Sequence, residues 1–305
     1  MAPELETKVG KLRLRNPTLL AGGILGLTGS SLKRVWESGA GAVVSKSVSK
    51  KPSEGYSGPC VVEVREGLLN AIGLSNPGVK GILGELEVAK NAGATVVGSV
   101  FGKTGADFAD VAREMEEVDI DAVELNLSCP HAGGLRAMGQ DPALVMKIIG
   151  AVKERVKVPV WAKLPGTTNV SNLVEVARAA EAAGADALTI SNTVPAIVFD
   201  IDAERPVLGH KIGGLSGPAI KPISMRLVYE ASQEVNIPVV GSGGVVTAHD
   251  AVEYFIAGAS AVQIGTGIMY RGLDIFKEVC DGIQSFMEQK DYKRVKDLVG
   301  RAHSA

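Results

Sequence analysis

Short apolar stretches alternate with amphipathic helical patterns along the whole chain. One phrase recurs: a helical stretch, a turn of small residues, and then a mostly apolar run. Clear copies are SGAGAVVSKS from Ser38, NAGATVVGSV from Asn91, AAGADALTIS from Ala182 and AGASAVQIG from Ala257. The apolar runs are continuous rather than alternating, which is typical of parallel strands buried on both faces. The glycine that follows the helical stretch suits a left-handed helix cap.

Eight strands are predicted from this pattern. They are Thr18–Ala21, Ala42–Val48, Thr95–Val100, Ala122–Leu127, Pro159–Leu164, Ala187–Ser191, Pro238–Gly241 and Ala261–Gly265. Helical patterns such as Pro142–Arg155, with Asp141 as cap, separate most of them. Eight such units in a chain of this length predict a (β/α)8 TIM barrel. An open doubly wound sheet is the alternative, but AGGILG at Ala21 lacks the G-x-G-x-x-G spacing of that fold.

Three segments stand outside the repeat. The stretch Lys8–Arg15 alternates and predicts a short N-terminal hairpin that closes the barrel floor. Ser49–Leu74 and Asn192–Pro218 are too long for ordinary connections, so we expect them to have a functional role. No linker or low-complexity block divides the chain, and residues 1–305 are predicted to form a single domain with that hairpin.

Composition and charge narrow the function. The 305 residues carry 32 Lys plus Arg and 34 Asp plus Glu, a net charge of −2 that gives no reason to expect nucleic acid or an anionic membrane as partner. No apolar run is long enough to span a bilayer, and the polar N-terminus is not a secretory signal. The distant cysteines Cys60, Cys129 and Cys280 exclude a disulfide framework and an iron–sulfur cluster held by this chain alone. They suit a reducing cytoplasm.

Polar and glycine residues gather where the predicted strands end, which is where barrel enzymes carry their chemistry. Gly243 and Gly244 follow the seventh strand, and Gly265 and Thr266 follow the eighth. Such turns expose backbone N–H groups, and this position is the usual phosphate site of phosphate-binding barrels. The simpler interpretation is that these glycines only permit sharp turns, but two such loops in consecutive strands favour phosphate.

Two lysines, Lys46 and Lys163, lie in apolar strands close to the same end of the barrel. A lysine in a buried strand is costly unless it meets an anion or a cofactor, although a lysine at a strand end can also extend to solvent. A flavin mononucleotide has a phosphate and a ring edge that lysine stabilises when the ring is reduced. This one ligand would account for both the lysines and the glycines.

The remaining candidates are a cysteine and several amides. Cys129 follows a predicted strand and can act as a nucleophile or as a base. Cys280 is predicted to be a small buried apolar residue. Asn126 and Asn192 at strand ends can read a planar ring with imide groups, although asparagine is also common in turns. The histidines His210, His249 and His303 have no metal-ligand spacing, and no metal site is predicted.

The sequence resembles the class 1 dihydroorotate dehydrogenases over nearly its whole length. The most specific segments are NAIGLSNPG at Asn70, ELNLSCPH at Glu124, LSGPAIKPI at Leu215 and the pair GSGG and QIGTG. The resemblance implies a (β/α)8 barrel with FMN at its mouth. It also implies that dihydroorotate is oxidised to orotate in pyrimidine biosynthesis.

The resemblance also implies roles for individual residues. Cys129 matches the catalytic base, Lys46 a lysine that touches both flavin and orotate, and Lys163 a lysine at the flavin ring. The orotate site is matched by Asn70, Ala71, Ile72, Gly73, Leu74, Asn126, Asn192 and Thr193. Further flavin contacts are matched by Gly22, Ser47, Ser99, Asn126, Ser191 and Gly217, and the phosphate site by Gly243, Gly244, Gly265 and Thr266. At Ser99 many relatives have Asn, and at Gly22 several have Ser, so these two contacts depart from the family pattern.

The resemblance leaves the electron acceptor open. The segment GLSGPAIKPISMRLVYE is more similar to the NAD-linked subtype, class 1B, in which a homodimer joins a subunit that carries FAD and a [2Fe–2S] cluster to form a heterotetramer. The alternatives are the fumarate-linked homodimer and a dihydropyrimidine (uracil) dehydrogenase-like flavoenzyme. A flavin-binding barrel without catalytic activity is a further alternative, against which Cys129 and the two lysines argue. A membrane-associated class 2 enzyme is disfavoured, because that class has serine as the base.

Overall fold

A closed barrel of eight parallel strands forms the centre of the molecule. The computed structural model describes residues 3–128 and 138–304. In chain order the barrel strands are β3 (Thr18–Leu20), β4 (Ala42–Val44), β7 (Val96–Val100), β8 (Ala122–Asn126), β9 (Val160–Lys163), β10 (Ala187–Ile190), β15 (Val239–Ser242) and β16 (Ala259–Ile264). The first and last strands pair, with Val262 opposite Thr18, so the sheet has no open edge. The predicted (β/α)8 barrel is confirmed, and the open doubly wound alternative is wrong.

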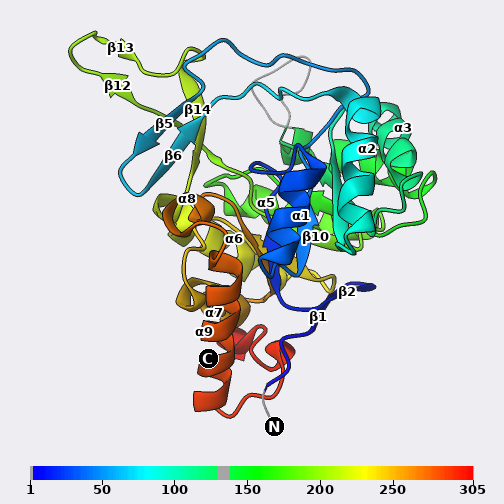
Figure 1. Ribbon diagram of the computed structural model, residues 1–305, viewed down its shortest axis with the longest axis vertical. Helices are drawn as coiled ribbons and strands as arrows, with labels where there is room; N and C mark the ends of the chain where they lie inside the picture. The colour runs from blue at the N-terminus through cyan, green and yellow to red at the C-terminus, as the bar shows by residue number, and fades with distance from the viewer. Residues whose placement is uncertain (1–2, 129–137, 305) are drawn as a thin grey trace.

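Helices cover the outside of the barrel (Figure 1). They are α1 (Gly29–Glu37), α2 (Gly78–Asn91), α3 (Gly105–Glu116), α4 (Pro142–Lys153), α5 (Val170–Ala182), α6 (Lys221–Ser232), α7 (Ala248–Ile256), α8 (Gly267–Arg271) and α9 (Ile275–Gln289). Local chemistry fixes several starts. Asp141 caps α4 with Pro142 at the first helical position, as predicted, and Thr104 and Thr247 form capping boxes at α3 and α7.

The interior of the barrel is apolar near its floor and polar near its mouth. Side chains alternate along each strand, so Leu19, Val97 and Trp161 point inward while their chain neighbours pack under the helices. The antiparallel hairpin of β1 (Thr7–Val9) and β2 (Leu12–Leu14) adds Val9 and Leu14 to this inner core. The hairpin therefore closes the floor of the barrel.

A second sheet stands over the opposite end of the barrel, at the top of Figure 1. Its strands, in spatial order, are β11 (Val194–Ile197), β14 (Ile212–Ser216), β6 (Gly67–Asn70) and β5 (Val61–Val64). Two segments far apart in sequence build it, since Leu215 pairs with Leu69. The short strands β12 (Phe199–Asp200) and β13 (Arg205–Pro206) extend from it as an arm. The two long connections therefore meet above the barrel mouth.

The remaining helical elements are single 3₁₀ turns. They are η1 (Met138–Gln140), η2 (Pro218–Ile220), η3 (Val295–Asp297) and η4 (Arg301–Ser304). Across residues 3–128 and 138–304, no helix is both long and apolar enough to cross a membrane.

Candidate active site

A cavity of about 760 Å³ lies between the barrel mouth and the second sheet. Its volume falls within the range of small-molecule and cofactor sites. Nearly all the predicted site residues that the structure describes line it. They are Gly22, Lys46, Ser47, Asn70, Ala71, Ile72, Gly73, Leu74, Asn126, Lys163, Ser191, Asn192, Thr193, Gly217, Gly243, Gly244, Gly265 and Thr266. Segments from one end of the chain to the other thus meet at a single site.

Lys46 follows strand β4 and is held by its backbone, whose N–H donates to Gly26 O at 2.8 Å. Its side chain is half-buried, and burial lowers the pKa of its ammonium below the ordinary 10.5. Within the described part of the chain, no carboxylate forms an ion pair with Lys46. An anionic ligand in the cavity would supply the missing counter-charge.

A chain of polar side chains crosses one wall of the cavity. Asn126 Nδ2 donates to Ser47 Oγ at 3.2 Å, and Asn192 Nδ2 donates to Asn126 Oδ1 at 3.1 Å and to Ser128 Oγ at 2.8 Å. Each amide is oriented by a neighbour on a different strand end. The wall therefore presents fixed donors and acceptors, which suits recognition of a planar polar ring.

Ser99 is the predicted cofactor contact that the structure places elsewhere. It is buried behind Ser47, where the two hydroxyls lie 2.8 Å apart, and it is not among the described residues that line the cavity. The shorter side chain explains this, since an asparagine at strand β7 would extend further toward the mouth.

The glycine turns after β15 and β16 form another part of the wall. Gly243 and Gly244 have φ of 135° and 71°, a region that other residues rarely adopt. A Cβ on Gly244 would lie 2.7 Å from the Cβ of Lys221 and 2.9 Å from Gly217 O. The turn is thus packed from behind, and any side chain there would strain the backbone that faces the cavity. On the neighbouring turn, Thr266 Oγ1 donates to Ser216 Oγ at 2.8 Å.

The second sheet supplies the roof. Asn70, at the end of β6, donates from Nδ2 to Gly214 O at 3.1 Å, so its side chain is tied to the neighbouring strand. Behind the following residues, Tyr56 N donates to Ile72 O at 3.1 Å, and the Tyr56 ring stacks on His210 with centroids 3.7 Å apart. These contacts hold the segment from Asn70 in place over the barrel.

The three cysteines differ in what the structure describes. Cys129, the predicted base, and the adjacent His131 lie outside the described residues. Cys280 is buried beside Thr18, and burial raises the pKa of its thiol to about 11, as expected for a structural residue. Cys60 is half-buried and its Sγ donates to Tyr56 O at 3.3 Å.

Two polar residues inside the barrel were missed by the sequence reasoning. Gln263 lines the cavity floor, and Glu124 lies fully buried beside it. Their signal was present in the sequence, since each stands at an inward-facing position of an otherwise apolar strand, in AVQIG and AVELN. Side-chain parity along β8 and β16 would have placed both beneath the mouth.

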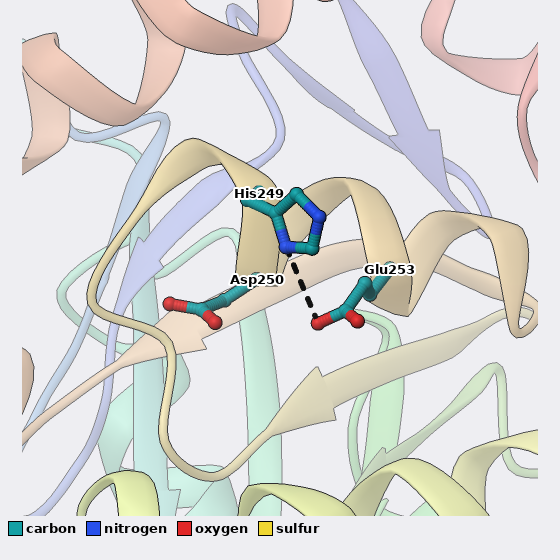
Figure 2. Close-up of side chains that lie close together, drawn as sticks. All are labelled: His249, Asp250 and Glu253. Carbon is teal, nitrogen blue, oxygen red and sulfur yellow. Dashed lines mark ion pairs between the residues drawn. The ribbon is translucent and has the colours of Figure 1, made fainter.

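Figure 2 shows a separate cluster of His249, Asp250 and Glu253 on α7, with the ion pair from His249 Nδ1 to Glu253 at 3.7 Å. The ammonium of Lys221 lies 2.6 Å from both carboxylates. Burial raises the pKa of Asp250, but hydrogen bonds from Lys221 and from backbone N–H groups outweigh it and leave that pKa lowered. Both carboxylates of the cluster thus already have a cationic partner in Lys221, and this contact ties α6 to α7.

Comparisons with known proteins agree with this geometry. The family model described as dihydroorotate dehydrogenase matches residues 4–287. The chain is 47% identical over 302 residues to the dihydroorotate dehydrogenase B (NAD(+)) catalytic subunit of Methanothermobacter thermautotrophicus, with 98% of each chain covered. It is 46% identical over 304 residues to the protein of the same name from Methanocaldococcus jannaschii, again with 98% of each covered.

A solved structure shares the fold. The crystal structure of dihydroorotate dehydrogenase from Eimeria tenella, in complex with ferulenol, aligns with a TM-score of 0.86 and 22% identity. The alignment covers 99% of this chain and 89% of that one. The family match and the full-length relatives together establish that this chain belongs to the dihydroorotate dehydrogenase family.

Proposed function

We propose that this chain is the catalytic subunit of an NAD-linked dihydroorotate dehydrogenase, which oxidises dihydroorotate to orotate in pyrimidine biosynthesis. One observation carries the proposal. A single cavity collects two lysines, two glycine turns and a wall of oriented amides at the barrel mouth. Relatives that are 46–47% identical over their whole length bear the name of this subunit.

The residues present fit an FMN cofactor. The phosphate of FMN would be held by Gly243, Gly244, Gly265 and Thr266, because the backbone of their turns lines the cavity. A Cβ at Gly244 would strain its turn, so a side chain there is disfavoured. Lys163 would hold the ring edge that becomes negative on reduction, and Ser47 and Ser191 would add polar contacts. Gly22 has no side chain, so only its backbone lines the cavity. It can offer the flavin a backbone contact, whereas the serine of several relatives can also offer a hydroxyl.

The substrate would lie between the amide wall and the roof. Lys46 would bind the carboxylate of dihydroorotate, which suits its half-buried ammonium and the absence of an ion-pair partner within the described residues. Asn126 and Asn192 would read the imide edges of the ring, as would the segment that follows Asn70. A carboxylate in the substrate thus distinguishes this site from one for uracil.

The chemistry needs a base on the substrate face of the site. We assign Cys129 as that base: its thiolate takes the proton from C5, and the C5–C6 double bond forms as C6 loses a hydride. When bound, FMN supplies the two-electron acceptor for that hydride. A thiol with an ordinary pKa of about 8.5 already provides a useful thiolate fraction near neutral pH. Ser128, the residue before Cys129 in the sequence, accepts a hydrogen bond from Asn192 Nδ2 at 2.8 Å.

We propose that the electrons then leave through a partner subunit that carries FAD and a [2Fe–2S] cluster, in a heterotetramer built on a homodimer of this chain. The name "catalytic subunit" of the relatives supports a partner. The three cysteines lie far apart in the sequence and cannot hold the cluster alone. A cytoplasmic location is part of the same proposal. The fumarate-linked homodimer is the competing assignment.

The first experiment uses the purified chain. It should be yellow, and dihydroorotate should bleach the flavin absorbance without oxygen, whereas dihydrouracil should not. Alone the chain should reduce a dye but not NAD, and the partner subunit should restore NAD reduction. Efficient turnover with fumarate and without a partner would contradict the NAD-linked assignment, and no bleaching would contradict the enzyme assignment.

Cys129→Ala should retain flavin and lose at least about 100-fold in dihydroorotate oxidation, since a positioned base contributes about 10²–10⁴-fold. The measurement is the anaerobic rate of flavin bleaching. Cys60→Ala is the matched control, because Cys60 lies outside the described residues that line the cavity. The flavin of this variant should bleach at the normal rate. A Cys129→Ala variant with the full rate at neutral pH would refute the base assignment.

A further inference from the structure

The barrel interior holds a buried ion pair just beneath the cavity. Glu124 and Lys163 are the two charged residues among the buried residues that the structure describes. Glu124 Oε1 lies 3.6 Å from Lys163 Nζ and accepts no hydrogen bond from any described residue. Lys163 lines the cavity, whereas Glu124 is fully enclosed.

Gln263 links the two charges. Its Oε1 accepts from Lys163 Nζ at 2.9 Å, and its Nε2 donates to Glu124 Oε2 at 2.6 Å. The amide can adopt only this orientation, because its oxygen faces a cation and its N–H faces an anion. Thr189 Oγ1 adds a second hydrogen bond to Glu124 Oε2 at 2.8 Å. The network thus fixes where the ammonium of Lys163 stands.

Burying this carboxylate is costly, and the barrel does not need it for packing. Other inward positions of the barrel carry apolar side chains, such as Leu19, Val44 and Val240. Apolar residues of similar volume usually replace a buried ion pair without loss of stability. The retained carboxylate therefore points to a role at the cavity, and the group it contacts there is Lys163.

We propose that Glu124 is a positioning residue: through Gln263 it anchors the ammonium of Lys163 at the cavity floor, and its negative charge offsets part of that ammonium's field. This inference rests on the proposed function, in which Lys163 faces a flavin. The site then favours the reduced, negatively charged flavin less strongly than an isolated lysine would. Glu124 thereby moderates the flavin potential from a position that no ligand touches.

The test is the midpoint potential of bound FMN, measured spectroscopically with reference dyes. Glu124→Gln keeps the side-chain shape and removes the charge. It should increase the preference of the protein for reduced over oxidised flavin by about tenfold, which is about 30 mV toward a less negative potential for a two-electron couple. The double variant Glu124→Gln with Gln263→Glu moves the carboxylate into direct contact with Lys163 and onto the cavity wall. Its potential should be more negative than that of the unmodified protein.

Thr189→Val is the matched control. It removes a hydrogen bond to the same carboxylate but no charge, and Thr189 lies outside the described cavity lining. It should lower thermal stability and leave the potential unchanged. The order of the potentials is the result: Glu124→Gln highest, the unmodified protein and Thr189→Val together, and the double variant lowest.

An unchanged or more negative potential in Glu124→Gln would overturn the proposal, as would a shift in Thr189→Val of the same size. If Glu124→Gln does not fold, the double variant provides the test, because it keeps one carboxylate and one amide in the network. A flavin potential at or above that of the unmodified protein would then contradict the proposal that a carboxylate offsets the field of Lys163. A protein that binds no FMN would instead refute the proposed function, so the two failures are distinguishable.

Discussion

At the scale of single residues, the burial of Lys46 bears on its proposed role in substrate binding. Burial disfavours its ammonium, so its pKa is lowered, and a bound carboxylate would restore the charged form. In the ligand-free protein the folded state releases this proton before the unfolded chain does. The sign of the linkage is therefore that stability rises with pH between the lowered pKa and the ordinary 10.5.

Dihydroorotate binding should weaken as the pH rises, whereas the stability of the ligand-free protein should increase. The dissociation constant of dihydroorotate, measured by calorimetry in Cys129→Ala to prevent turnover, should be constant at low pH. It should then rise by up to about tenfold per pH unit once Lys46 of the free protein loses its proton, because binding now takes up a proton. The rise should begin below pH 10.5, since burial lowers this pKa.

Lys46→Gln should remove that pH dependence and weaken binding at neutral pH by at least about 30-fold, or about 2 kcal/mol, because it leaves a buried carboxylate without its partner. Lys50→Gln is the matched control, since Lys50 is exposed and pairs with Asp110 at 2.8 Å on the outer surface. A Lys46→Gln variant with the same pH profile as the normal protein would show that another group binds the carboxylate.

The sequence indicated which residues gather at the cavity where strand ends carry unusual chemistry. Lys46, Gly243 and Asn192 follow strands whose positions the apolar pattern fixes, and all three line the cavity. Ser99, which departs from the family pattern, is absent from the described cavity lining, because a strand pattern gives the face of a residue but not how far a short side chain extends. Side-chain parity along β8 would have placed Glu124 inside the barrel, but its pairing with Gln263, 139 residues away, needed the fold.

At the scale of elements, the barrel strands were predictable and the second sheet was not. Buried parallel strands have continuous apolar sequences, so all eight barrel strands were predicted with ends within a few residues of those observed. Strands β5, β6, β11 and β14 are short and half-exposed. The pairing of β6 with β14 joins them into one sheet across more than a hundred residues, as in Asn70 with Gly214. That central pairing depends on the barrel bringing two long connections together, which no local pattern encodes.

Helix α2 offers a matched pair of glycines for a stability test. Gly84 lies in the helix interior with open space around the position of a Cβ, whereas a Cβ on Gly81 would lie 2.9 Å from Pro77 Cβ. Gly84→Ala should therefore raise the free energy of unfolding by about 1 kcal/mol, the usual gain of alanine over glycine in a helix. Gly81→Ala should gain less or destabilise. Urea unfolding measures both, and equal gains would contradict the packing argument.

At the scale of the whole molecule, the cavity joins distant parts of the chain. Its lining runs from Gly22 after the first barrel strand to Thr266 after the last, and it includes Asn70 and Gly214 from the second sheet. We therefore expect ligand binding to stabilise both the contacts that close the barrel and the contacts that hold its roof. Because the hairpin floor and the barrel share one inner core, we propose that the chain unfolds as one domain.

FMN should accordingly raise the melting temperature of the flavin-free protein in a single transition. A ligand that binds only the folded state at 100 times its dissociation constant adds about 2.7 kcal/mol of stability. Riboflavin is the matched control, because it offers the same ring without the phosphate and should raise the melting temperature less at equal concentration. Equal shifts with the two ligands would mean that the turns at Gly243 and Gly265 do not hold a phosphate. Two separate transitions, of which only one responds to FMN, would mean that the chain is not one cooperative unit.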